Sequence, residues 1–269
     1  MRKKLFTLLS LLALIGVLAW AEETGTSEDT TTYVAKVGDT QYETLQDAID
    51  AATGDNPTVS LLSNVTLDKT VTINKSLTLD LVSFNIEAVD TRALHITGGN
   101  VVIQRSGTTK GYIIAKPAAE NSTFDENSSV IRVGDNSGEQ RNVSLTIEKN
   151  VRVNTDYCYG ITVFGNKTKE TVTINGTVTT AGKNAAISGN GSSGYGGTTI
   201  TINGTVYATG SKVEEVPYSI YHPQDGTLNI NGTVGSTSLS KSGAIEAKSG
   251  IININENAKV YAAKNAISR

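Results

Sequence analysis

The sequence has few of the residues that cross-link or bend a chain. It contains one cysteine (Cys158), four prolines, two histidines, one tryptophan and one methionine among 269 residues. A single thiol excludes an internal disulfide, so we expect backbone hydrogen bonds and packing to hold the fold, with Cys158 as a small buried residue. Positive charge is not in excess either, since 23 Lys and Arg face 26 Asp and Glu. This balance argues against nucleic acid as a partner, because phosphate backbones select basic clusters.

The first residues have the pattern of a secretory signal peptide. Three basic residues at 2–4 precede an apolar run over 5–19, and Ala-Trp-Ala at 19–21 is a small-x-small cleavage site. We therefore expect residues 1–21 to be removed and the protein to be secreted or held at the cell surface. The apolar run is shorter than the ~20 residues that a membrane span needs, so we do not expect a spanning protein. Residues 22–32 are polar and are predicted to be a flexible lead-in.

One amphipathic helix is predicted, at 44–53. Its apolar residues recur at i, i+3, i+4 and i+7 and are Leu45, Ala48, Ile49 and Ala52. Thr44 is placed to cap the helix, and Gly54 is expected to end it. A short strand over 33–37 and a Gly-Asp turn precede it.

The remainder of the chain is an internal repeat of alternating apolar and polar residues. Its central isoleucines recur every 24–28 residues and are Ile147, Ile174, Ile202, Ile230 and Ile254. A second row keeps the same phase and consists of Ile161, Ile187, Ile220, Ile245 and Ile267, with Ile96 and Ile131 as earlier members. A unit this short buries its apolar residues only by stacking on its neighbours, which predicts a solenoid.

An asparagine follows the apolar residues at corresponding points of the repeat. The set is Asn74, Asn175, Asn203, Asn231 and Asn255. Stacked asparagine side chains can hydrogen-bond from coil to coil, and Asn-Gly suits a tight corner, so we predict a structural asparagine ladder. A sandwich of hairpins with Asn-Gly turns is the alternative. It explains the triplets one by one but not their period.

The segment 33–53, which contains TLQDAIDAA, resembles the N-terminal cap of the pectate-lyase-like superfamily, and the VTIN-type repeats are similar to the coils of those proteins. The resemblance extends over residues 33–269. It implies an all-β fold, a single-domain right-handed parallel β-helix of roughly eight coils with one N-terminal capping helix. The superfamily includes lyases, hydrolases, adhesins and bacterial surface proteins, so the resemblance indicates fold much more than function.

Enzymes of this superfamily typically combine clustered aspartates for Ca²⁺ with a basic residue, or grouped aspartates with a histidine. The candidates that adjacent coils could bring together are Asp90, Arg92, His95, Arg132 and Asp135. None of the five belongs to the hydrolase patterns NTD, DD or GHG. His95 and His222 are expected four coils apart, or about 19 Å, too far to share a proton or a metal. We expect no catalysis, metal or cofactor, with Ca²⁺ only if the protein is a lyase.

Aromatic side chains are the remaining candidates for a binding site. The residues proposed to bind are Tyr157, Tyr159, Tyr218, Tyr221 and His222. Tyrosine faces beside Asp and Asn suit sugar binding. The sequence therefore predicts a non-catalytic, adhesin-like module that presents an extended face to an extracellular glycan or a host or cell-surface protein. A lyase or hydrolase acting on acidic polysaccharide and a structural stalk are the alternatives.

The repeat continues to the last residues, where no capping pattern follows Ile267. An uncapped parallel edge invites pairing with more chain. We therefore expect the chain to be a fragment, or its last coil to pair with a partner.

Overall fold

The structure is a computed structural model. It describes residues 32–120, 122–135, 142–165, 169–189, 198–210, 217–223, 225–236, 243–263 and 265–269. The expected signal peptide and nearly all of the expected lead-in lie outside these ranges. The described residues belong to one compact unit, Thr32–Arg269. No helix in the described ranges is long and apolar enough to cross a membrane.

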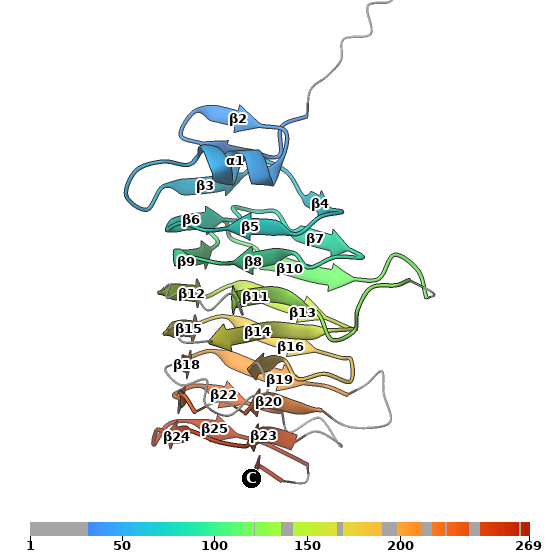
Figure 1. Cartoon of the computed structure of the whole chain (residues 1–269), viewed down its shortest axis with the longest axis vertical. Coiled ribbons are helices and arrows are strands. Elements are labelled where there is room, and N and C mark those ends of the chain that lie inside the picture. Colours follow the sequence, from blue (N-terminus) through green and yellow to red (C-terminus); the bar gives the residue numbers. More distant parts are fainter. Residues whose placement is uncertain are drawn as a thin grey trace, which may run out of the picture. The chain divides into compact units, whose positions relative to one another are not determined.

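Successive strands go to three sheets in turn (Figure 1). The first sheet, in pairing order, is β2 (Thr40–Tyr42), β1 (Ala35–Val37), β3 (Thr58–Leu61), β6 (Leu77–Asp80), β9 (Gly99–Gln104), β12 (Val143–Ile147), β15 (Glu170–Ile174), β18 (Thr199–Ile202), β21 (Thr227–Ile230) and β24 (Ile251–Ile254). The second is β4 (Val65–Leu67), β7 (Ile86–Val89), β10 (Gly111–Lys116), β13 (Val151–Thr155), β16 (Thr177–Thr180), β19 (Thr205–Ala208), β22 (Thr233–Val234) and β25 (Lys259–Val260). The third is β5 (Val71–Ile73), β8 (Leu94–Ile96), β11 (Ser129–Asp135), β14 (Tyr159–Gly165), β17 (Ile187–Gly189), β20 (Tyr218–His222), β23 (Gly243–Ala247) and β26 (Ile267–Ser268).

One pass through the three sheets makes one coil, and strands of successive coils pair in parallel. Six coils, from β6–β8 to β21–β23, have a parallel neighbour on both sides, and one further coil lies at each end. Figure 1 shows the coils stacked from α1 (blue) to β24 and β25 (red). The predicted parallel β-solenoid is confirmed, and the hairpin sandwich is excluded because its neighbouring strands would be antiparallel.

The isoleucine rows form the core. Ile147, Ile174 and Ile202 are direct neighbours in the first sheet and are fully buried, and the row continues to Ile254 in the last coil, which is 47% exposed. The second row pairs in register through the third sheet from Ile131 to Ile267. Its expected first member was wrong. Ile131 lies beside Leu94, whereas Ile96 lies beside Val133.

The cap is a hairpin with one short helix. The helix α1 (Leu45–Ala51) buries Leu45, Ala48 and Ile49, as its spacing predicts. The Thr44 hydroxyl accepts a hydrogen bond from the Asp47 amide at 3.1 Å and donates to the Asp47 carboxylate at 2.6 Å. The helix ends earlier than expected, because Ala52 is already extended. The sequence did not predict β2, which pairs with β1, while β1 covers the edge of β3.

The asparagine ladder is present at the corner between the first and second sheets. The Asn203 amide donates to Asn175 Oδ1 at 2.9 Å, Asn231 donates to Asn203 at 2.7 Å, and Asn255 donates to Asn231. Asn175 in turn donates to a carboxylate oxygen of Glu148 at 3.2 Å. This confirms the ladder for four of its five predicted members.

The fifth member was placed in the wrong row. Asn74 follows β5 of the third sheet, whereas Asn175, Asn203, Asn231 and Asn255 follow strands of the first sheet. The sequence Thr-Ile-Asn is the same in both places, so a local match cannot tell which sheet a strand joins.

Candidate functional site

The outer face of the third sheet gathers most of the predicted site residues. Its central outward row is His95, Arg132, Thr162, Ser188, Tyr221 and Glu246, one residue from each successive coil. Parallel strands lie about 4.8 Å apart, so this row extends over roughly 24 Å. Its first part is basic, and its last two members are the aromatic Tyr221 and the acidic Glu246. Residues proposed for catalysis and residues proposed for binding therefore share one face.

The basic part, which we call the arginine cluster, consists of Arg92, His95 and Arg132. Arg92 donates from Nε to the Ser129 hydroxyl and from a terminal nitrogen to the Ser128 hydroxyl, both at 3.2 Å. The guanidinium carbon of Arg132 lies 4.1 Å from the centroid of the Phe164 ring, which is a cation–π contact. These contacts fix both guanidinium groups on the face of the sheet.

Burial and mutual repulsion lower the pKa values of the residues in the arginine cluster. Burial lowers the pKa of Arg92, and the neighbouring Arg132 lowers it further. Burial also lowers the pKa of His95, and so do both arginines, against a hydrogen bond from Nε2 to the Gly134 carbonyl oxygen at 3.1 Å. In the part of the chain that the structure describes, neither arginine forms an ion pair. The carboxylates of Asp125 and Asp135 act in the opposite direction and offset only part of this lowering, so the cluster keeps an excess of positive charge.

The two predicted aspartates differ in position. Asp135 ends β11, close enough to Arg132 to offset part of the lowering of its pKa that burial causes. Asp90 does not join the cluster. It lies at a corner with φ of 56° and accepts hydrogen bonds from the Ala118 amide, at 2.7 Å, and from the Ser122 hydroxyl. These bonds lower the pKa of Asp90 and attach the segment after β10 to the corner.

The aromatic part, which we call the tyrosine hollow, has a volume of about 310 Å³. Tyr159, Tyr218 and Tyr221 line it, together with Lys183, Asn184 and Glu246. Burial raises the pKa of the Tyr159 phenol, and Tyr221 is close enough to raise it further. Gly243 lies directly beside Tyr218, and a Cβ added there would be 2.3 Å from the Tyr218 ring. The ring therefore lies over a position that only glycine leaves open.

Two predicted binding residues are elsewhere. Tyr157 lies at the corner between the second and third sheets, stacked on Phe124 with 5.6 Å between ring centroids, and its hydroxyl donates to the Phe124 carbonyl oxygen at 3.0 Å. The prediction for His222 was wrong. It is fully buried inside the solenoid, where burial lowers its pKa, because it directly follows the outward Tyr221. Alternation along the strand could have placed it inside.

His95 and His222 lie in β8 and β20, four coils apart as predicted. Cys158 is also inside, fully buried as expected, and burial raises the pKa of its thiol to about 11.

The corner next to Tyr157 contains the acidic residue Glu126, a candidate from the sequence, and two that the sequence did not single out, Glu120 and Asp156. A hollow of about 530 Å³ is lined by Glu120, Glu126, Asp156, Tyr157 and Lys183, among others, and Glu126 pairs with Lys183. Asp156 ends an Asn-Thr-Asp triplet at 154–156, which was the available signal. Among the described residues, no group of three or more His, Cys, Asp or Glu side chains could hold a metal ion.

Comparison of the chain with known protein families, with curated proteins and with solved structures finds no match.

Proposed function

We propose that this protein is a secreted or cell-surface module that binds glycans on the outer face of its third sheet. The observation that supports the proposal best is the gathering of Tyr159 from β14 and of Tyr218 and Tyr221 from β20 into one hollow. Tyrosine rings present an apolar face to a sugar ring and a hydroxyl to its polar groups. Asn184, Lys183 and Glu246 add polar groups at the same hollow, which is the usual composition of a saccharide site.

The arginine cluster lies in line with this hollow on the same face. A glycan that extends along the solenoid axis from the hollow would reach Thr162 and then Arg132. The guanidinium groups there favour a ligand with negatively charged groups, because a carboxylate or sulfate would neutralise them. A protein partner with an acidic surface would use the same charge but has less need of the tyrosines.

A glycan array that includes neutral and acidic saccharides tests the proposal. We expect binding to at least one class of saccharide, and loss of that binding in the double variant Tyr218→Ala with Tyr221→Ala. The matched control is Tyr207→Ala with Tyr261→Ala, two tyrosines outside the hollow. Array binding that is unchanged by the first pair would refute the tyrosine site. No binding to any saccharide would favour the stalk.

The second candidate function is a polysaccharide lyase or glycoside hydrolase. Two features favour it: the carboxylates of Glu126 and Asp156 at one hollow, and the burial of Arg132, which lowers its pKa and so favours the neutral guanidine that a general base requires. Incubation with polygalacturonate and other acidic glycans, followed by detection of new reducing or unsaturated ends, tests it. Cleavage abolished by Asp156→Asn would support a hydrolase, and cleavage abolished by Arg132→Ala a lyase. Intact polymer after long incubation would contradict both.

A further inference from the structure

The corner between the first and second sheets has a second polar surface. Asn-Gly-Thr triplets at 175–177, 203–205 and 231–233 occupy it in three successive coils. Their threonines pair in register as neighbours, and their asparagines belong to the asparagine ladder. We call the triplets the Asn-Gly-Thr corner.

The glycines of this corner are required by the stacking of the coils. A Cβ on Gly204 would lie 2.0 Å from the carbonyl oxygen of Gly176, and one on Gly232 would lie 2.2 Å from that of Gly204. No side chain can project at the glycine positions. The glycines therefore form a row of bare backbone between the side-chain amides of the asparagines and the hydroxyls of the threonines. A hollow of about 320 Å³ lies over its first two glycines, Gly176 and Gly204.

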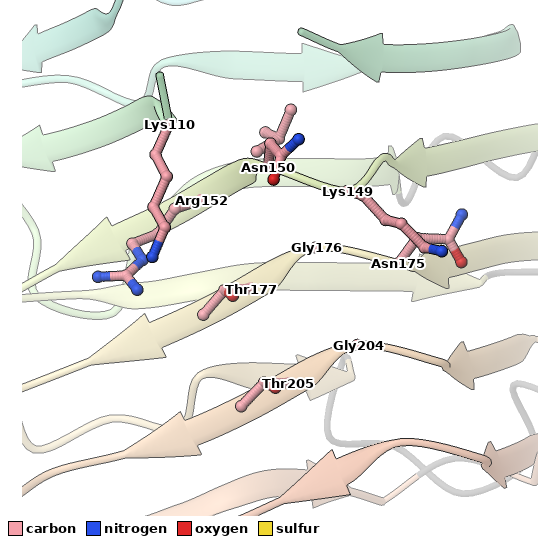
Figure 2. Close-up of a pocket in the computed structure, with 10 residues that line it drawn as sticks. Lys110, Lys149, Asn150, Arg152, Asn175, Gly176, Thr177, Gly204 and Thr205 are labelled. Atoms are coloured by element: carbon pink, nitrogen blue, oxygen red, sulfur yellow. The ribbon is translucent and has the colours of Figure 1, made fainter. Parts of the chain in front are cut away.

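Three basic side chains surround the start of this hollow. Lys110 directly precedes β10, Lys149 lies in the turn between β12 and β13, and Arg152 is in β13. Figure 2 shows Lys110 and Arg152 on one side of Gly176, and Lys149 with Asn175 on the other. Basic residues from different coils therefore line one hollow, with Lys149 across Gly176 from Lys110 and Arg152.

These three charges have no acidic partner in the described part of the chain. None of the three forms an ion pair there, and no acidic residue lines the hollow, although acidic residues outnumber basic ones in the sequence. The acidic side chain nearest in sequence, Glu148, does not line the hollow; it accepts a hydrogen bond from Asn175, so its negative charge lies at the Lys149 side only. The guanidinium carbon of Arg152 lies 5.7 Å from the centroid of the Tyr112 ring, and its Nε is buried without a partner. Like charges that line one hollow favour an added anion.

We propose that this hollow binds an acidic saccharide, with carboxylate or sulfate groups beside Lys110 and Arg152 at one side and beside Lys149 at the other, and with sugar hydroxyls along the Asn-Gly-Thr corner. Thr177 and Thr205 can donate to and accept from sugar hydroxyl groups. The amides of the ladder keep one N–H each after bonding their neighbours. The coil spacing of about 4.8 Å repeats these groups along the axis, which suits a linear polymer of sugar units better than a single small ion. This site is separate from the tyrosine hollow, which lies on the third sheet.

The test uses the protein with Lys110, Lys149 and Arg152 all replaced by Gln. The matched control replaces Lys36, Lys69 and Lys169 by Gln, so that net charge changes equally away from the hollow. Binding of each protein to immobilised dextran sulfate, polygalacturonate and unsubstituted dextran is measured at low and physiological salt. Circular dichroism and thermal unfolding establish that all variants are folded. If the triple variant does not fold, Lys149→Gln alone, at an exposed position, replaces it.

We expect the native protein to bind at least one charged polymer and the triple variant to bind it at least about tenfold more weakly, which corresponds to the loss of one or more charged contacts. The control variant should retain its affinity within about twofold, and plain dextran should not bind. Loss with dextran sulfate assigns a sulfate, and loss with polygalacturonate a carboxylate. Equal weakening in both triple variants, or no binding to either charged polymer, overturns the proposal. The tyrosine double variant should bind normally here, which separates this site from the tyrosine hollow.

Discussion

The side-chain amide of Gln46 makes two hydrogen bonds with the backbone of Thr72. Its Oε1 accepts from the Thr72 amide at 2.8 Å, and its Nε2 donates to the Thr72 carbonyl oxygen at 3.1 Å. Thr72 lies in β5, the first strand of the third sheet, whose outer edge has no strand beside it in the described chain. One side chain of the capping helix thus takes the place of a neighbouring strand.

Replacement of Gln46 by Ala should therefore destabilise the cap. Two backbone groups at an edge lose their partners, and we expect the free energy of unfolding to fall by about 1–2 kcal/mol. Urea unfolding followed by circular dichroism measures it. Gln41→Ala, an exposed glutamine in β2, is the control and should change stability by less than about 0.5 kcal/mol. Equal effects of the two variants would contradict the edge role.

The hydrogen bonds of the asparagine ladder all run in one direction, and this can be tested by removing one donor. Asn203 donates to Asn175 and accepts from Asn231, so Asn203→Asp keeps the acceptor but loses the donor. At neutral pH a carboxylate would face the Asn175 oxygen, and we expect a loss of about 1–2 kcal/mol. Acidification below the pKa of the new carboxyl restores a donor and should reduce the loss. Asn74→Asp, outside the row, should cost much less; a comparable cost would mean that the ladder bonds contribute little.

Gly243 is predicted to control the position of Tyr218. In Gly243→Ala the new Cβ would overlap the ring, so the ring must move out of its place in the tyrosine hollow. We expect saccharide binding to weaken severalfold while the fold is kept, since the strand itself can accept alanine. A crystal structure of the variant, with binding to the same array, checks this. An unmoved ring with unchanged binding would show that the contact is not restrictive. Gly250→Ala is unsuitable as a control because that glycine has a positive φ of 82°.

His95 should titrate below the ordinary histidine pKa of 6.5, because burial and the two arginines disfavour its charged form. The unfolded chain then binds more protons than the folded one below about pH 6.5, so His95 makes the protein less stable as pH falls through that range. Arg132→Gln removes one positive neighbour and should raise the pKa of His95. NMR titration of the imidazole signals measures both values. A pKa that falls or stays constant in Arg132→Gln would contradict the proximity of the two groups.

The sequence was sufficient for the elements whose signal is periodic. Ile174 and Ile202 recur with the length of one coil, and a unit that cannot bury them alone must stack, so the solenoid and its asparagine ladder follow from the pattern. The helix was predictable because Leu45, Ala48 and Ile49 share one face. Predicting the solenoid and the helix does not depend on knowing which sheet a strand joins.

The features that the sequence did not predict depend on which sheet each strand joins and on its register there. Asn74 and Asn175 follow the same local sequence but lie at different corners. Ile96 lies two residues away from the position that pairs with Ile131, although the sequence suggested that the two belong to one row. His222 points into the solenoid and Tyr221 points out because consecutive side chains of one strand lie on opposite faces of the sheet. Arg92, Arg132 and Phe164 are far apart in the chain, and only the stacking of three coils brings their side chains together.

The sequence by itself thus determined the kind of protein: a repeat whose apolar period requires stacked coils and whose corners require Asn-Gly. The tertiary structure decided which side chains meet, on which of three faces and against which neighbours. The physical reason is that periodicity is a property of each segment, whereas a site on a solenoid is built across coils, from residues that are one full turn apart in the chain and about 4.8 Å apart in space.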